Sequence, residues 1–185
     1  MKRFITITSV LLMLVGCSSA ASGYDHRPMV VSDQKNSVAN KYSDDPLKLH
    51  RNTVRMKQVI KYLRTKVGVT PYVFSGSSPR GWDCSGLVRW TYQRFGLEIP
   101  HSADKQAHIG KRVSNPRAGD VVVFAYKGSH SFYHSAIYIG NGKIINAHYG
   151  ARSTIIQPLS DYKNSQIRFV RVIDQVSNKK PAFAG

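Results

Sequence analysis

The sequence predicts an α+β domain in which N-terminal helices pack on an antiparallel β-sheet of about five strands. Between residues 51 and 110 the apolar residues recur at helical spacing. From residue 120 onward they lie in short extended segments that Gly, Asn and Pro separate. Helices followed by adjacent strands are typical of the α+β class. A chain of 185 residues is long enough for one such core.

The rest of the chain divides into three further segments. Its N-terminus has a basic start and then an apolar run that is too short to span a bilayer comfortably, which is typical of an export signal. Polar residues without a sustained apolar period follow this run, and polar residues also end the chain. We therefore expect a signal peptide (1–16), a flexible tether (17–50), the folded domain (51–175) and a disordered tail (176–185).

The motif "LVGC" at the end of the signal resembles the bacterial lipobox. The resemblance implies that the signal is cut before Cys17 and that the Cys17 thiol is acylated, so that lipid anchors the protein to a membrane. Ser18 shows no sign of an inner-membrane retention signal, which favours the outer membrane, with the domain facing the periplasm. An ordinary signal peptide, or a membrane anchor that happens to contain a cysteine, is the alternative.

Three helices are expected in the first half of the domain. The first has Asn52 as its N-cap and Gly68 as its stop signal. The second begins near Asp83 or Cys84 and ends at Gly96. A short third helix covers "SADKQAHIG". Strands follow, and they cover residues 120–126, 134–140, 143–149, 153–158 and 166–173.

The number of cysteines in the chain points to a chemical role for Cys84. Lipidation of Cys17 leaves Cys84 without a disulfide partner, although exported proteins usually pair their thiols or lack them. Only a thiolate is strongly nucleophilic, and a helix N-terminus lowers the pKa of a thiol there and offers N–H groups to an oxyanion. We therefore expect Cys84 to be a nucleophile, and an inert buried cysteine is the alternative.

A nucleophilic thiol also needs a base, and the hairpin after residue 133 offers two histidines. If Gly140 to Gly142 form a three-residue turn, His134 lies opposite His148 and diagonal to Asn146, and the three share one face. A two-residue turn at Asn141-Gly142 shifts the pairing by one and separates them. We expect the first register, because it leaves an apolar face of isoleucines and alanine on the other side.

The remaining histidines carry no such signal. His26 and His50 belong to the tether, His130 to a loop, and His101 and His108 to the surface around the third helix. A zinc site made of Cys84 and the hairpin histidines has no familiar ligand spacing. We therefore expect no metal and no cofactor.

Three blocks of the chain together resemble the NlpC family of papain-like cell-wall peptidases. They are "GWDCSGLVRW", "RAGDVVVF" and "HSAIYIGNGKIINAH", in this order. The resemblance implies a papain-like fold with Cys84 as the nucleophile and His134 as the general base. Asn146 falls on the polar residue that orients the imidazole, where many members carry histidine, and His148 competes for this role.

The same resemblance implies where substrate binds. Tyr72 matches a tyrosine that lines the site and helps to bind the oxyanion. Asp83 and Ser85 match positions that in some relatives hold a free amine of the stem peptide. The expected reaction is hydrolysis of peptidoglycan stem peptides, at the γ-D-glutamyl to meso-diaminopimelate bond or at the D-Ala to diaminopimelate cross-link.

The formal charge of +17 favours anionic partners. Nucleic acid is not expected, because an exported lipoprotein rarely meets it and the basic residues form no block with interleaved aromatic residues. Cell-wall polymers and anionic lipid are closer at hand. We expect a monomer that acts on peptidoglycan. The alternatives are a wall-binding lipoprotein without catalysis and a thiol-dependent acyl or amide transferase.

Overall fold

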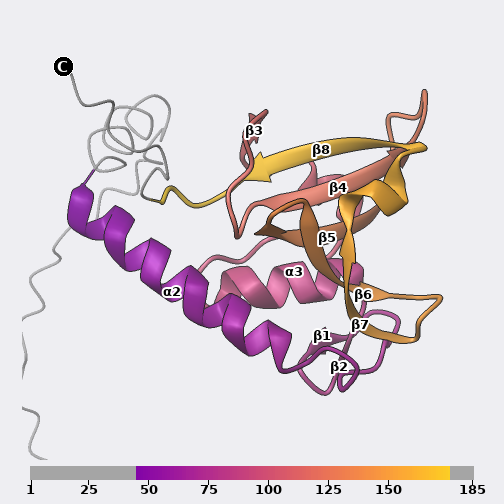
Figure 1. Ribbon diagram of the computed structural model, residues 1–185, viewed down its shortest axis with the longest axis horizontal. Helices are drawn as coiled ribbons and strands as arrows, with labels where there is room; N and C mark the ends of the chain where they lie inside the picture. Colours follow the sequence, from indigo (N-terminus) through magenta and orange to yellow (C-terminus); the bar gives the residue numbers. More distant parts are fainter. Residues whose placement is uncertain (1–44, 176–185) are drawn as a thin grey trace, which may run out of the picture.

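A computed structural model describes residues 45–175 (Figure 1). The expected signal peptide, the lipidated Cys17, the tether up to residue 44 and the tail after residue 175 lie outside the described residues. No helix within the described part is long and apolar enough to cross a membrane. Its elements are α2 (Pro46–Arg64), β1 (Ser77–Ser78), β2 (Gly81–Trp82), α3 (Cys84–Gln93), α4 (Ala103–Gln106), β3 (Lys111–Val113), β4 (Val121–Tyr126), β5 (Phe132–Gly140), β6 (Lys143–His148), β7 (Ser153–Pro158), the 3-10 helix η1 (Leu159–Tyr162) and β8 (Ser165–Arg171).

Helix α2 begins earlier than the apolar period indicated. The side chain of Asp45 caps it by accepting from the Leu47 amide at 2.9 Å, and Pro46 occupies the first turn. Residues 46–50, which we expected in the tether, are therefore helical, and Asn52 as the N-cap is wrong. Asn52 instead donates from Nδ2 to the Asp174 carbonyl at 2.9 Å. The helix ends at Arg64, before the expected stop at Gly68.

The other two helices lie where the sequence placed them and are shorter. Helix α3 has Asp83 as its N-cap and ends at Gln93, before Gly96. Helix α4 is a single turn that Ser102 caps. The C-cap residue of each of these helices has right-handed helical geometry. The glycine with positive φ that follows α3 therefore lies beyond the end of the helix.

Six strands form one antiparallel sheet in the order β3-β8-β4-β5-β6-β7. The five expected strands are all present. The sixth, β3, was not predicted, because its three residues, Lys111–Val113, carry no alternating apolar pattern and pair only at the sheet edge. A separate two-stranded sheet, β1-β2, lies in the segment just before α3.

The β5-β6 hairpin has the expected register in its body and a different turn. Ile137 pairs with Ile145, which is the register that places His134 level with His148. At the tip, however, Gly140 pairs with Lys143, so the turn is the two-residue Asn141-Gly142 form. A bulge between the two pairings restores the register. Both turn residues have positive φ, 52° and 66°, as a primed two-residue turn requires.

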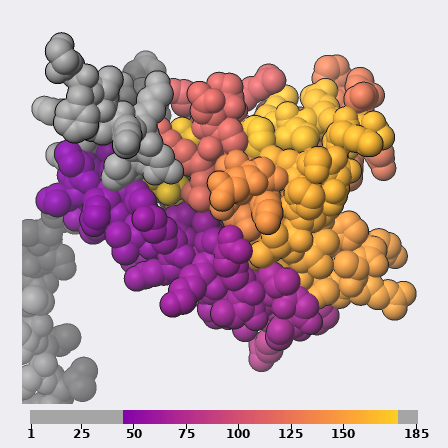
Figure 2. Space-filling view, viewed as in Figure 1, coloured from indigo at the N-terminus to yellow at the C-terminus, as the bar shows by residue number. Residues whose placement is uncertain are grey.

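The central strands of the sheet are largely buried on both faces. One face of β4, β5 and β6 packs with α2 and α3 into a core that includes Leu63, Leu87 and Ile137. On the other face, side chains of β4, β5, β6 and β8 pack with η1 around Phe124 and Ile144. Helices α2 and α3 lie on the same side of the sheet (Figure 1), and α2 forms one flank of the molecule while the C-terminal strands form the opposite flank (Figure 2).

Candidate active site

A cavity of about 250 Å³ lies where the N-terminus of α3 meets the sheet. Cys84 and His134 both line it, so the two residues predicted to react share one cleft. Four tyrosines and His148 make up most of the remaining wall. The lining residues are Tyr72, Cys84, Tyr133, His134, His148, Tyr149, Gly150 and Tyr162.

Local hydrogen bonds fix Cys84 at the first position of α3. The Asp83 carboxylate accepts from the Gly86 amide at 2.7 Å and from the Ser85 hydroxyl at 3.0 Å. It also accepts from the Ser75 amide at 3.0 Å and lies 2.9 Å from His101 Nε2. Asp83 thus ties the preceding loop and the segment before α4 to the start of the helix.

A close backbone approach completes this end of the site. A Cβ atom at position 86 would lie 1.9 Å from the Gly76 carbonyl oxygen, a distance that no side chain tolerates. The glycine in the "DCSG" motif therefore lets the loop before α3 pack against the first turn of the helix. The sheet bridge between Tyr72 and Trp82 holds the other end of that loop.

The resting thiol of Cys84 is not activated in the way the helix start led us to expect. Burial raises the pKa of Cys84, and the Asp83 carboxylate raises it further. The backbone N–H groups of Ser135, Ser85 and Cys84 lower the pKa, but they do not offset burial. The expected net lowering is therefore wrong for the free protein, because the cost of burying a charge exceeds the benefit of the helix end.

His134 is held by Asn146 on the neighbouring strand. His134 Nε2 lies 3.0 Å from Asn146 Oδ1, and Asn146 is fully buried. Since Oδ1 only accepts, Nε2 carries the proton and Nδ1 keeps its lone pair. Burial lowers the pKa of His134 to about 4, and the hydrogen bond with Asn146 raises it. His134 is therefore a neutral base at physiological pH.

His148 lines the cavity, and its hydrogen bond goes to Ala151 and not to His134. Its Nδ1 accepts from the Ala151 amide at 3.0 Å, which ties the ring to the turn after β6. The predicted shared face of His134, Asn146 and His148 is confirmed, and Asn146 is the member that bonds to the base. Among residues 45–175, no group of three or more His, Cys, Asp or Glu side chains could hold a metal ion.

Tyr72 is the one of the three expected substrate-binding residues that faces the cavity. Its ring meets Tyr149 edge-on at 5.4 Å. Burial raises the pKa of Tyr72, and Cys84 and Asp83 raise it further, so the phenol stays a hydrogen-bond donor. Asp83 and Ser85 are buried and bonded to each other, which gives both a structural role at the helix start.

Several neighbours of the site had no signal in the sequence. Tyr162 from η1 stacks on Phe124 at 3.9 Å and lies 5.9 Å from the His134 ring. Burial raises the pKa of Tyr162 to about 12. His101, which we expected on the surface, contacts Asp83. These contacts join elements far apart in the chain, so residue spacing could not predict them.

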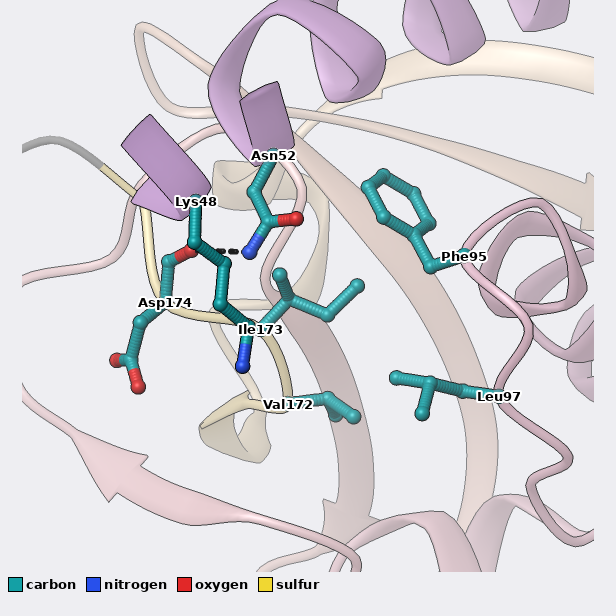
Figure 3. Close-up of a pocket in the computed structure, with 7 residues that line it drawn as sticks. All are labelled: Lys48, Asn52, Phe95, Leu97, Val172, Ile173 and Asp174. Atoms are coloured by element: carbon teal, nitrogen blue, oxygen red, sulfur yellow. Dashed lines mark hydrogen bonds between the residues drawn. The ribbon is translucent and has the colours of Figure 1, made fainter. Parts of the chain in front are cut away.

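A second cavity, of about 320 Å³, lies between the N-terminus of α2, the end of α3 and the segment after β8 (Figure 3). Phe95, Leu97 and Ile173 point into it, and the hydrogen bond from Asn52 to Asp174 closes one side. Its lining contains no cysteine or histidine. It therefore lacks the nucleophile and base that the first cavity contains.

Comparisons with known proteins found a matching family model and similar proteins. The model of the NlpC/P60 family matches residues 68–172. The gamma-DL-glutamyl hydrolase of Bacillus subtilis (strain 168) is 36% identical over 126 residues, which are 66% of this chain and 30% of that protein. The Escherichia coli (strain K12) protein named murein DD-endopeptidase MepS/murein LD-carboxypeptidase is 32% identical over 149 residues, 78% of each chain.

Solved structures of NlpC/P60 proteins are similar in fold. The crystal structure of an NlpC/P60 family protein from Bacillus cereus ATCC 10987 is similar with a TM-score of 0.58 and 30% sequence identity. The similarity covers 64% of this chain and 40% of that one. The chain thus spans only 30% of the Bacillus subtilis relative and most of the Escherichia coli relative.

Proposed function

The chain belongs to the NlpC/P60 family, and from this premise we propose that it is a cysteine peptidase that hydrolyses the stem peptides of peptidoglycan. The observation that carries the proposal is the hydrogen bond of 3.0 Å by which buried Asn146 holds His134, whose ring lines the same cavity as Cys84. A thiol, a neutral imidazole and an acceptor that fixes the imidazole are the parts that thiol-dependent acyl transfer needs.

The protonation states favour a general-base mechanism. Because burial keeps both Cys84 and His134 neutral, the thiol proton passes to His134 Nδ1 as the sulfur attacks the peptide carbonyl carbon. The carbonyl oxygen becomes an oxyanion, which the N–H groups at the α3 start and the Tyr72 hydroxyl are suited to receive. The intermediate collapses, the C–N bond breaks, and the leaving amine takes the proton from His134.

The second half-reaction returns the free enzyme. Cys84 is now a thioester of the acyl fragment. A water molecule gives one proton to His134 and adds its oxygen to the thioester carbonyl. When the C–S bond breaks, the sulfur regains a proton from His134 and the carboxylic acid leaves. No cofactor enters these steps.

We infer that the bond cleaved joins D-glutamate, through its γ-carboxyl, to meso-diaminopimelate. The name of the Bacillus subtilis relative, a γ-glutamyl hydrolase, supports this bond. The Escherichia coli relative is named for a DD-endopeptidase activity, which supports the D-Ala to diaminopimelate cross-link as the second candidate. The two bonds leave different new termini, so the products distinguish them.

Digestion of purified, diaminopimelate-containing sacculi with mass spectrometry of the released fragments tests the function. We expect fragments with a free γ-carboxyl on D-glutamate, from the intact protein and not from Cys84→Ala. Cleavage of the cross-link would instead free the carboxyl of D-Ala. No cleavage by the intact protein, or equal cleavage by Cys84→Ala, would contradict the proposal. Binding to sacculi without release would favour the wall-binding alternative, and fragments of added mass would favour acyl transfer.

We also propose that the protein is a monomer that a lipid on Cys17 anchors to the outer membrane, facing the periplasm. The "LVGC" motif supports the anchor. Membrane fractionation of cells that carry the full chain or Cys17→Ser tests it. We expect the full chain in the outer-membrane fraction and the variant in the soluble periplasmic fraction. An identical distribution of the two proteins would contradict it.

A further inference from the structure

The orientation of the Asn146 amide decides which nitrogen of His134 can act as the base. Asn146 is fully buried, so both ends of its amide need partners within the protein. With Oδ1 toward His134, the imidazole proton lies on Nε2 and Nδ1 is free to take the Cys84 proton. An amide rotated by 180° would present Nδ2 to His134 and force the imidazole proton onto Nδ1. Nδ1 would then have no lone pair with which to accept the Cys84 proton.

Gln157 on β7 contacts the other end of this amide. Asn146 Nδ2 donates to Gln157 Oε1 at 3.1 Å. In the β6-β7 pairing Asn146 is opposite Ile155 and Ile144 is opposite Gln157, so Gln157 lies diagonal to Asn146 on the same sheet face. Gln157 does not line the cavity that contains Cys84 and His134.

Asp161 in η1 gives this chain of hydrogen bonds a direction. Gln157 Nε2 donates to Asp161 Oδ2 at 3.4 Å. A carboxylate only accepts, so it draws the NH₂ end of Gln157 and leaves Oε1 for Asn146. Oε1 in turn draws the NH₂ end of Asn146 and leaves Oδ1 for His134. The order Asp161, Gln157, Asn146, His134 is therefore consistent at every step.

We propose that Gln157 is a positioning residue that, through Asn146, holds His134 in the tautomer with its proton on Nε2. Gln157 touches neither the substrate cavity nor the thiol. Its effect is on the turnover step, which needs the free Nδ1, and not on substrate binding. The kinetic part of this inference rests on the proposed peptidase function, whereas the tautomer of His134 is a property of the free protein.

Three substitutions at position 157 separate positioning from packing. Gln157→Leu removes the acceptor, Gln157→Glu keeps an acceptor toward Asn146, and Gln157→Lys offers only a donor and favours the rotated amide. We expect kcat to fall about 10- to 100-fold in Gln157→Leu, to fall further in Gln157→Lys and to stay within about threefold in Gln157→Glu, with KM nearly unchanged. Gln58→Leu, at an exposed position of α2, is the matched control.

Nitrogen NMR of the histidine rings reads the tautomer directly and needs no activity. We expect the His134 proton on Nε2 in the wild type and Gln157→Glu, and on Nδ1 in Gln157→Lys. The inference is overturned if Gln157→Lys keeps the proton on Nε2, or if Glu and Leu reduce kcat equally. If the wild type shows the expected tautomer but cleaves no stem peptide, the proposed function fails and the inference stands.

Asn146→Asp provides an independent check on the route. A carboxylate accepts with either oxygen, so Asp at position 146 offers an acceptor to His134 in both orientations and does not need Gln157 to fix one of them. Gln157→Leu should therefore cost little further kcat in the Asn146→Asp background. An equal loss in both backgrounds would show that Gln157 acts by packing and would overturn the inference.

Discussion

The two ends of the candidate site are built by different means. The nucleophile end is local: the Asp83 carboxylate that caps α3 bonds to Ser75, Ser85 and Gly86, all close in the sequence. The base end joins three neighbouring strands, β5, β6 and β7, through His134, Asn146 and Gln157. A short motif thus specifies the thiol, whereas strand register specifies the base. Substitutions should damage the two ends in different ways.

The largest effect is expected where the two ends meet. Cys84→Ala removes the only proposed nucleophile, and His134→Gln removes the base, so each should reduce kcat/KM by about 10³- to 10⁴-fold or more. Release of soluble fragments from sacculi measures this loss. Because the two residues act as one unit, the double variant should be no worse than either single variant. A multiplicative loss would mean that they act separately.

A smaller effect is expected at Asn146. Asn146→Ala should reduce kcat by about 10²- to 10³-fold, because the imidazole loses the acceptor that fixes its tautomer. Asn146→Asp keeps the acceptor and should retain more of the activity than the alanine variant. Steady-state kinetics on a defined muropeptide measure both. Equal activity of the wild type and Asn146→Ala would remove Asn146 from the base end and leave His148 as the candidate.

At the nucleophile end, Asp83 should act on stability more than on binding. Asp83→Ala removes the N-cap of α3 and should lower the free energy of unfolding by about 1–2 kcal/mol, as urea denaturation measures it. Asp83→Asn keeps a capping acceptor and removes the charge. A large rise in KM for Asp83→Asn, with stability unchanged, would favour the predicted binding of a substrate amine over the structural role.

The buried base should also make the stability depend on pH. The pKa of His134 is about 4 in the folded protein, against an ordinary value of 6.5. Between these values the unfolded chain binds the proton and the folded protein does not, so the free energy of unfolding falls as the pH falls from about 6.5 toward 4. His134→Gln should lose this part of the slope. Parallel pH profiles of the two proteins would contradict the neutral, buried state of His134.

The position of Cys84 at the start of α3 was predicted from the sequence, because the features that fix it lie close together in the chain. The "DCSG" motif combines a capping aspartate, a thiol at the first helical position and a glycine where the loop packs closely, and each acts within a few residues. The hydrogen bond of Asp83 with His101 was missed, since it comes from a separate segment. The thiol pKa was also missed, because burial depends on the packing of the whole cleft.

The base end could be predicted only as far as the hairpin allowed. The glycines around Asn141 indicated the register that brings His134 and Asn146 together, although the turn is shorter than expected and a bulge compensates. Gln157 and Tyr162 were missed, because their positions depend on how β7 and η1 return to the sheet. The residue spacing does not determine where β7 and η1 lie against the sheet.

The most direct test of the account is the protonation state of Cys84 in an active preparation. The ultraviolet absorbance of the thiolate, as the difference between the wild type and Cys84→Ala, measures it across the pH range. Because burial raises the pKa of Cys84 above its ordinary 9.0, we expect no thiolate signal at neutral pH in protein that digests sacculi. A full thiolate signal at neutral pH would show a preformed thiolate and imidazolium pair and would contradict the neutral resting site.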